Sequence, residues 1–488
     1  MQIPFGEWLP DQPEYLNPGA NTANNVYFAR QSYKRFPSLV AYSSNNITSN
    51  SRGAGSFRDN SNNVFNFVAN NTDIFQLDGG TFTSRKSSLT GTNTDYFTFT
   101  QFGQFVVASN GKDAPQYYEM GTSTNFANLS SIGTSGTVPV FKVSGVVRDF
   151  FVTGNHTNNS NRIQWSGIND LTTWQSGTKQ SDLQDLPGSG GQITHITSGE
   201  IGYVFRQNQI IRMDYVGGAT VFRLSVISPN RGAVLGRTVC QDNRRVFFYA
   251  DDGFYELNGD QVISIGAEKV NRFFDTDLNK AFSDRICAAV DPFNQLALWL
   301  YPSASNTANT TGICDKVIIY NYATQKWSTA DASASSIFSQ FVGAYTVELM
   351  DIISENLDNI NIALDTDFWN GGQRYLGAID NNFKAAIFSG TENEGTIETR
   401  EMELFPGHRS SITNVRPIVD ATSTVTIKTK ERLADTATES TSSTMVTSGD
   451  NPVRQSGRYF KIKVITPSGS VWTHAQGVDV IASRIGLR

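Results

Sequence analysis

Histidines are the first residues to examine for chemistry, because an imidazole can bind zinc or act as a general base near neutral pH. Neither H-x-x-x-H nor H-E-x-x-H occurs, so the helical spacing that presents two zinc ligands on one face is missing. The nucleophile elbow G-x-S-x-G is absent at any strand-to-helix turn. We therefore expect surface or turn positions for the four histidines, which are His156, His195, His408 and His474.

Carboxylates offer a second route to catalysis, since glycoside hydrolases use two of them across the scissile bond. Acidic residues cluster in two places, at Asp251 with Asp252 and at Asp275 with Asp277. Any set of Asp-rich loops offers such pairs. We expect these four to be solvated turn residues and not catalytic groups.

Sialidases carry repeated S-x-D-x-G-x-x-W turns, and residues 165–174 (WSGINDLTTW) are the nearest match here. Counting back from Trp174 places Leu171, Asn169 and Gly167 where that motif needs Gly, Asp and Ser, so the match fails. Residues 188–191 (GSGG) have no downstream phosphate-loop lysine and are predicted to form a flexible loop.

Cysteines indicate neither a disulfide framework nor a zinc knuckle, because their number is odd and no C-x-x-C pair exists. Cys240, Cys287 and Cys314 are predicted to be small core residues. A calcium loop of the EF-hand type is also missing. The sequence thus predicts no catalytic residue, no cofactor and no metal site.

A weak repeat of strand, turn and strand runs along most of the chain and defines the scaffold. The predicted strand pairs are 64–69 with 74–77, 105–108 with 117–118, 150–153 with 163–165, 203–205 with 210–213, and 246–250 with 254–257. Several meet at Asn-Asn, Asn-Gly or Asp-Gly, and Asn-Gly and Asp-Gly accept the positive φ of hairpin turns.

The spacing of these hairpins predicts a β-propeller. Successive steps of 39, 45, 53, 44 and 51 residues separate Ala69, Ala108, Thr153, Arg206, Ala250 and Tyr301. Propeller blades of four strands repeat at about 40 to 50 residues. The sixth blade would use 296–301 with 316–320, and residues 320–327 (YNYATQKW) look like one kelch strand pair. A pair of β-sandwiches with hairpins spaced by accident is the alternative.

We therefore expect an all-β fold, a propeller of about six to seven blades with short inserted helices. A seventh blade would lie among residues 336–349 and 375–388, without strand assignments. Residues 268–285 fit an amphipathic helix, and 349–357 are a second candidate helix. Beyond about residue 405 the chain is rich in Ser and Thr, which indicates an all-β C-terminal module or strands that return to the propeller. The predicted divisions are an N-terminal segment over 1–60, the propeller over 61–404 and the C-terminal module over 405–488.

Charge and hydropathy exclude two classes of protein. The formal charge is 39 − 45 = −6, so no global basic field is available to hold nucleic acid by counterion release. The N-terminus lacks the features of a signal peptide, and no apolar run approaches the ~20 residues that span a bilayer. We expect no sequence-specific DNA binding and no membrane insertion.

Several ordered segments carry a resemblance to a known family. They are 4–11 (PFGEWLPD), 17–19, 25–26, 101–108, 110–111, 165–167 with 174, 199–202, 212–213, 215–217, 252–255, 265–266, 291–292, 320–327, 457–459, 472–477 and 486–488. In this order they resemble the tail hub or nozzle proteins of short-tailed bacteriophages, including the packaged-DNA stabilisation proteins. The likeness covers nearly the whole chain. One departure is Tyr96-Phe97, where Arg-Trp is expected before the Phe-Gly segment.

The resemblance implies a structural virion protein and not an enzyme. It implies a homohexameric ring that joins the head-tail adaptor to the distal tail, docks tail fibres or a tail needle, retains packaged DNA and forms the ejection channel. Such a protein is assembled in the host cytoplasm and resides in the virion tail. Double-stranded DNA would pass through the lumen without sequence-specific binding.

Two other functions are compatible with the sequence. A receptor-binding or glycan-binding tail propeller would use the aromatic-rich hairpins and is tested by binding or turnover on host surface glycans. A cellular scaffold propeller would bind other proteins, but the weakly charged Asn, Ser and Thr surface suits docking less well, since interface hot spots favour aromatic residues and Arg.

Overall fold

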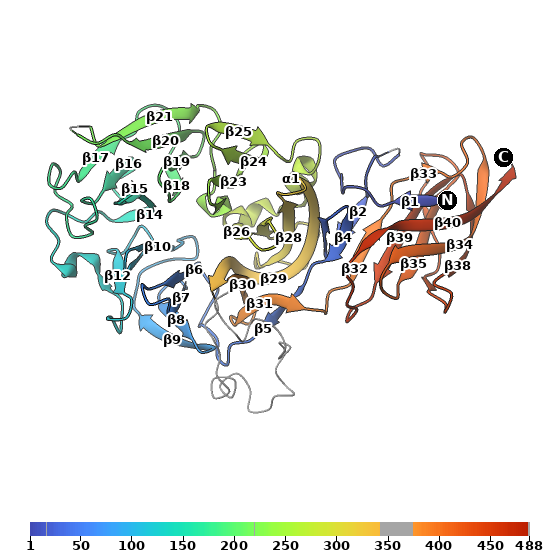
Figure 1. The fold of residues 1–488 in the computed structure, drawn as a ribbon, viewed down its shortest axis with the longest axis horizontal. Coiled ribbons are helices and arrows are strands. Elements are labelled where there is room, and N and C mark those ends of the chain that lie inside the picture. The colour runs from blue at the N-terminus through green and yellow to red at the C-terminus, as the bar shows by residue number, and fades with distance from the viewer. Residues whose placement is uncertain (16, 219, 342–373, 487–488) are drawn as a thin grey trace.

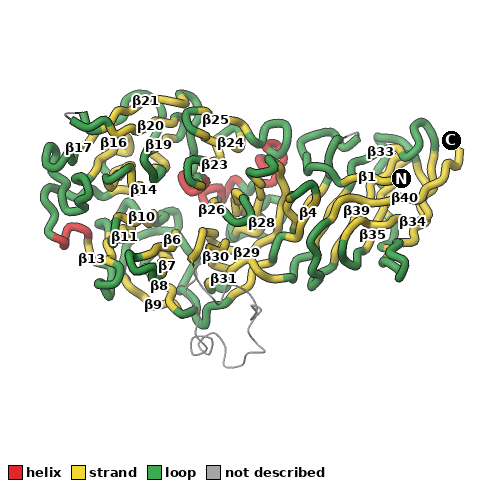
Figure 2. Tube along the Cα trace, in the orientation of Figure 1, coloured by secondary structure: helices red, strands yellow, loops and turns green. Residues whose placement is uncertain are grey.

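Strands dominate the computed structural model, which describes residues 1–15, 17–218, 220–341 and 374–486. Figure 1 shows a disc of radiating sheets and, beside it, an elongated β module that contains both chain ends. Helices are short, and Figure 2 shows how little of the chain they occupy. Those described are α1 (Asn271–Asp277) and the 3-10 turns η1 (Leu129–Ile132), η2 (Gly236–Thr238) and η3 (Lys280–Arg285).

Four-stranded antiparallel sheets form the blades of a β-propeller, and in each the first strand lies nearest the axis. Blade 1 consists of β6 (Gly53–Arg58), β7 (Val64–Ala69), β8 (Ile74–Asp78) and β9 (Thr81–Lys86). Blade 2 consists of β10 (Thr98–Phe102), β11 (Phe105–Ser109), β12 (Gln116–Glu119) and β13 (Ala127–Asn128). Blade 3 consists of β14 (Phe141–Val147), β15 (Phe150–His156), β16 (Asn159–Trp165) and β17 (Asp182–Asp185).

The next three blades repeat the pattern. Blade 4 consists of β18 (Ile193–Ile196), β19 (Gly202–Arg206), β20 (Ile210–Tyr215) and β21 (Phe222–Ser228). Blade 5 consists of β22 (Cys240–Asp242), β23 (Arg245–Ala250), β24 (Gly253–Asn258) and β25 (Gln261–Ser264). Blade 6 consists of β26 (Cys287–Asp291), β27 (Leu296–Tyr301), β28 (Cys314–Asn321) and the first half of the long strand β29 (Lys326–Phe341).

Blade 7 closes the ring with strands from two distant parts of the chain. The second half of β29 pairs with β30 (Arg374–Asp380), which pairs with β31 (Ala385–Gly390). The outermost strand is β5 (Ser38–Ala41), where Ala41 lies opposite Ala386 and Val40 opposite Ile387. Because β5 precedes blade 1 in the chain, this pairing ties the beginning of the propeller to its end.

Apolar side chains fill the spaces between the blades. Seven clusters of buried residues are present in the described chain, and they follow the blade interfaces around the ring. Aromatic rings dominate many of them. Phe67 of blade 1, for example, meets Tyr118 and Phe126 of blade 2 at ring-centroid distances of 5.0 Å each. Burying such rings stabilises each interface, at about 2 to 3 kcal/mol per fully buried large apolar side chain.

The elongated module is a sandwich of two sheets that share the largest cluster of buried residues. One sheet consists of β3 (Val26–Ala29), β4 (Ser32–Arg35), β40 (Ala475–Gly486), β34 (Arg409–Val419) and β38 (Asn451–Gly457), with β1 (Gln2–Pro4) also paired to β40. The other consists of β2 (Thr22–Asn24), β32 (Gly395–Glu398), β39 (Tyr459–Thr466), β35 (Thr424–Lys430), β36 (Thr438–Glu439), β37 (Ser443–Thr444) and β33 (Met402–Glu403).

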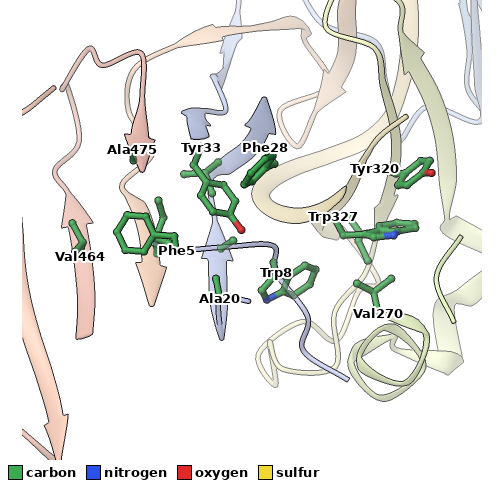
Figure 3. Packing of buried hydrophobic residues seen from close by; sticks show 14 of the residues in the cluster. Phe5, Trp8, Ala20, Phe28, Tyr33, Val270, Tyr320, Trp327, Val464 and Ala475 are labelled. Atoms are coloured by element: carbon green, nitrogen blue, oxygen red, sulfur yellow. The ribbon is translucent and has the colours of Figure 1, made fainter. Parts of the chain in front are cut away.

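The propeller and the sandwich are joined through the backbone. Asn24 of β2 pairs in parallel with Thr329 of β29, while the other edge of β2 pairs with β32. One hydrogen-bonded sheet therefore runs from blade 6 into the sandwich. Figure 3 shows the apolar packing that continues across this junction, from Val464 and Phe5 on one side to Trp327 on the other.

The expectation of an all-β propeller with six to seven blades is confirmed, and the number of blades in the described residues is seven. Six predicted hairpins form the second and third strands of blades 1 to 6. The predicted Asp-Gly turn differs in detail. Ala250 pairs with Gly253, so Asp251 and Asp252 form the two-residue loop and Gly253 begins β24.

The expected chain divisions differ from the observed sheets. Residues 1–60 do not form one leader, because β1 to β4 complete the sandwich, β5 completes blade 7 and β6 begins blade 1. The strands β32 and β33 lie before residue 405 but pair with β39 of the sandwich. The strands of the first 60 residues therefore belong to the sandwich, to blade 7 and to blade 1.

The helix expected over residues 268–285 is shorter and broken. Its two parts are α1 and η3, and Leu278 between them has an extended backbone (φ −68°, ψ 124°). Asp277 accepts hydrogen bonds here from the Tyr301 hydroxyl and Lys316, which fixes the end of α1 against blade 6. The second expected helix, over 349–357, lies outside the described residues.

Candidate functional site

A cavity of about 600 Å³ lies on the propeller axis, and the innermost strands of all seven blades line it. A volume of this size suits a small molecule or a single side chain of a partner. Its charged lining residues are Lys142, Arg237, Arg374, Asp242 and Asp284. Amide and hydroxyl groups of blades 1, 4, 5 and 7 alternate with these. Apolar side chains such as Phe97, Val239 and Phe338 line it as well, so the cavity is a channel of mixed polarity.

At one mouth of this channel, where the innermost strands begin, arginine side chains lie around a single aromatic ring. The guanidinium carbon of Arg237 lies 4.1 Å from the ring centroid of Tyr96, and that of Arg52 lies 5.6 Å from it. The Tyr96 hydroxyl donates a hydrogen bond of 2.9 Å to Asp284. Arg285 follows Asp284 in the chain and, with Arg52 and Arg237, lines a second, small cavity beside the channel. We call Arg52, Tyr96, Arg237, Asp284 and Arg285 the mouth cluster.

Loops and short turns position the mouth cluster. Tyr96 precedes β10, and Arg237 sits in η2, which leads into β22. The backbone of η2 presses against blade 4 so closely that a Cβ on Gly236 would lie 1.8 Å from the Thr194 carbonyl oxygen. Only glycine fits this contact, which holds Arg237 over the channel.

Burial and like charge both act on these groups. Burial lowers the pKa of Arg52, and the charges of Arg285 and Arg237 lower it further, while Tyr96 opposes the shift. Burial raises the pKa of Tyr96. Such shifts mark a site where charge is held away from water, which is where binding and catalysis concentrate in proteins.

The four histidines do not come together. His156 is buried at the end of β15, where its Nε2 lies 3.0 Å from the Thr153 hydroxyl. His195 lines the channel from β18. Burial lowers the pKa of His156 and that of His195 to about 4, so both imidazoles are neutral at pH 7. His474 hydrogen-bonds to Thr473 beside Asp420, on the sandwich. The expectation of surface or turn positions is thus wrong for His156, because its ring fills a space inside blade 3.

The four carboxylates considered for glycoside hydrolysis bind to separate partners. Asp252 forms an ion pair with Arg231 at 3.0 Å and accepts from the Tyr255 hydroxyl at 2.8 Å. Asp275 pairs with Lys280 at 2.8 Å, whereas Asp277 accepts from Tyr301 at 2.9 Å. Asp251 is an exposed turn residue.

A buried arginine organises the glycine loop at residues 188–191. Arg206 donates to the carbonyl oxygens of Gly191 (2.8 Å), Pro187 (2.8 Å) and Gly188 (3.2 Å) and is 0% exposed. This loop was expected to be flexible, but its carbonyls are used to solvate a guanidinium.

The three cysteines are buried, as expected for core residues. Burial raises the pKa of the Cys287 thiol, which keeps it protonated at neutral pH. Among the described residues no three His, Cys, Asp or Glu side chains come together as a metal site would need. Within the same ranges, none of the helices has the length and apolar character that crossing a bilayer requires.

The mouth cluster was missed by sequence reasoning. Arg52, Arg237 and Arg285 lie far apart in the chain and in no motif, and only closure of the ring brings them together. No local pattern in the sequence marks Tyr96 as their partner.

Comparisons with known proteins identify no family. No family model matches the chain, and no curated protein matches it. Among solved structures it is similar to a chain of the mitotic checkpoint complex, with 10% identity over 74% of this chain and 97% of that chain, at a TM-score of 0.40. It is also similar to the Pan2 WD40 domain of Neurospora crassa, with 7% identity over 74% and 96% of the two chains, at a TM-score of 0.37.

Proposed function

We propose that this chain is a structural subunit of a short-tailed bacteriophage tail, in the hub or nozzle ring between the head-tail adaptor and the distal tail. The proposal rests on the ordered segments that resemble those proteins along nearly the whole chain. In this role the protein retains packaged DNA and forms part of the ejection channel. It acts as a scaffold and not as an enzyme.

The observation that carries the proposal is where the resembling segments lie in the fold. Residues 4–11 form the junction between propeller and sandwich, with the Trp8 ring edge-on to Phe273 at 5.0 Å. Residues 472–477 end at Gly477, where a Cβ would lie 2.4 Å from the Ile3 carbonyl oxygen. Trp327, at the end of 320–327, is 0% exposed in the core that the two modules share. These segments fix how the two modules are held, which is what an assembly subunit must keep constant.

Rigidity at the junction suits a part that transmits force along a tail. A continuous sheet crosses the junction, together with an ion pair of 2.7 Å between Lys269 and Glu7. Hydrogen bonds cross it too, donated by the backbone amide of Asp331 and by the side-chain amide of Asn24. Identical subunits that dock head to tail close into a ring when the rotation allows it. Six copies would then bring the propellers and sandwiches into one assembly.

Duplex DNA would pass between the subunits and not through a propeller. A channel of about 600 Å³ has the size of a small-molecule pocket. Six copies would total 6 × −6 = −36 charges. An acidic lumen repels phosphates and a neutral one does not attract them, so either lets DNA slide. A cryo-EM map of the tail with a basic lumen wall would contradict this part of the proposal.

Stoichiometry and tail assembly test the proposal directly. We expect the purified protein to form closed rings at high concentration, seen by negative-stain microscopy and sedimentation velocity, alone or with the adaptor. Phages that lack the gene should fill heads, lose DNA and show incomplete tails. A protein that stays monomeric with and without the adaptor, together with complete tails in its absence, would rule the function out.

A second function is favoured by the channel itself. Its polar lining and the mouth cluster could receive an acidic sugar, as a receptor-binding or glycan-binding tail propeller would. Binding of the purified protein to host surface glycans separates the two functions. Saturable glycan binding without ring formation would favour the second.

A further inference from the structure

The mouth cluster holds more positive than negative charge. Three guanidinium groups, those of Arg52, Arg237 and Arg285, line the same small cavity. The carboxylate of the cluster is Asp284, whose Oδ2 accepts the Tyr96 hydroxyl. Three cations and one anion leave a net charge of +2 at a site that the protein partly shields from water.

Neutral partners satisfy two of the three arginines in part. Arg52 is 3% exposed, and its guanidinium donates to the side-chain oxygens of Asn71 at 3.0 Å and Asn93 at 3.3 Å. Arg285 donates to the Thr311 carbonyl oxygen at 2.9 Å, while its buried Nε has no hydrogen-bond partner in the described chain. These contacts supply hydrogen bonds but no counter-charge.

Arg237 is the arginine of the mouth cluster whose guanidinium remains available for a ligand. Among the described residues its guanidinium contacts the Tyr96 ring and makes no hydrogen bond or ion pair. It also lines both cavities, the channel and the small one beside it. Its donors therefore lie where a molecule in the channel can reach them.

We propose that the mouth of the propeller channel is a binding site for a small oxyanion, held chiefly by Arg237 and supported by the charges of Arg52 and Arg285. Buried charge is costly unless a counter-charge compensates it. The planar fork of arginine matches the two oxygens of a carboxylate or phosphate. The channel beyond has room for the rest of a small molecule. This site is independent of the tail function proposed above.

Calorimetric titration of the full-length protein with inorganic phosphate and with acetate tests the site at low salt. We expect one saturable site for at least one of the two anions, with weaker binding as sodium chloride is added. The stronger of the two identifies the preferred oxyanion. Arg237→Gln should weaken binding at least tenfold, and Arg237→Lys, which keeps the charge but loses the fork, should fall between.

Arg244→Gln is the matched control, because it removes the same charge from an exposed turn of blade 5 outside the channel lining. It should bind as the unaltered protein does. Circular dichroism and the urea midpoint check that each variant is folded. If Arg237→Gln does not fold, Arg237→Lys takes its place in the comparison. No saturable binding of either anion, or equal losses in Arg237→Gln and Arg244→Gln, would overturn the proposal.

Discussion

Trp299 and Trp327 lie stacked in blade 6, with ring centroids 5.8 Å apart and planes inclined by 26°. Each indole N–H reaches a different connection of blade 5. Trp299 donates to the Thr238 carbonyl oxygen before the blade, and Trp327 donates to that of Ile265 after it, both at 2.9 Å. The stacked pair therefore fastens both ends of one blade to its neighbour.

Replacing Trp327 by Phe should lower the free energy of unfolding by about 1 to 3 kcal/mol. The change removes the hydrogen bond to a buried carbonyl and leaves a small cavity. Urea unfolding measured by circular dichroism checks it. Phe293→Ala is the control, since Phe293 is 85% exposed, and it should change stability by less than about 0.5 kcal/mol. A loss as small as that of the control would show that the pair does not fasten the blade.

Val40→Ala tests the closure of the ring by β5. Val40 is 9% exposed between blades 7 and 1, and truncating a buried aliphatic side chain costs about 2 kcal/mol. Amides of β31 should exchange faster in this variant than in Val226→Ala, whose side chain is 53% exposed on β21. Equal exchange in the two variants would mean that β5 does not hold the ring closed.

The cap of α1 offers a test of the junction. No side chain of the helix itself caps its N-terminus, but Asp11 accepts from the backbone amides of Arg272 (2.8 Å) and Phe273 (2.7 Å). Asp11→Ala should cost about 1 kcal/mol, as the loss of a helix cap does. Asp11→Asn retains one acceptor oxygen and should lose less. Thermal unfolding should therefore show a larger loss of stability for Asp11→Ala than for Asp11→Asn. The reverse order would contradict the role of Asp11 as a cap.

Acid sensitivity should arise from His195, whose pKa burial lowers to about 4, and equally from His156. Burial lowers its pKa to about 4, and the positive charge of Arg162 adds to the shift, whereas the unfolded imidazole titrates near 6.5. Between pH 4 and pH 6.5 the unfolded state binds more protons than the folded state does. The free energy of unfolding is therefore highest above about pH 6.5 and falls as the pH falls towards 4. The part of the loss at pH 5 that comes from His156 should be about 2 kcal/mol relative to pH 7.

His156→Gln should roughly halve the dependence of stability on pH between pH 5 and pH 7, whatever it does to the absolute value, because His195 keeps its own share. His474→Gln, at an exposed position on the sandwich, should leave the slope unchanged. Urea midpoints at both pH values provide the comparison. If the slope in His156→Gln equals that of the unaltered protein, His156 does not contribute to the acid sensitivity.

Local patterns in the sequence revealed the blades but not their closure. Strands such as β7 and β23 are runs of aromatic and β-branched residues that end at a turn, and these signals are local. β5 is four residues long (SLVA) and carries no pattern of its own. Its place in blade 7 depends on pairing with β31, far away in the chain, and the same holds for β2 beside β29.

The candidate site was out of reach for a similar reason. Searches for chemistry look for residue types at fixed spacing, and that reasoning located the histidines, acids and cysteines without bringing any of them into one site. Arg52, Arg237 and Arg285 meet because three connections of three blades end at the same mouth. Tertiary structure alone sets that convergence.

The pairing of β5 with β31 also governs how the protein is made. Residues 38–41 leave the ribosome early, but their partners at 385–390 follow only after roughly 20 to 70 seconds at ~5–20 residues per second. Until then blade 7 cannot close, and the first strands also wait for β40 at the end of the chain. A nascent chain must keep these edges from pairing with its neighbours on the same polysome, so slow translation or a scarce chaperone should reduce the yield before any step of assembly begins.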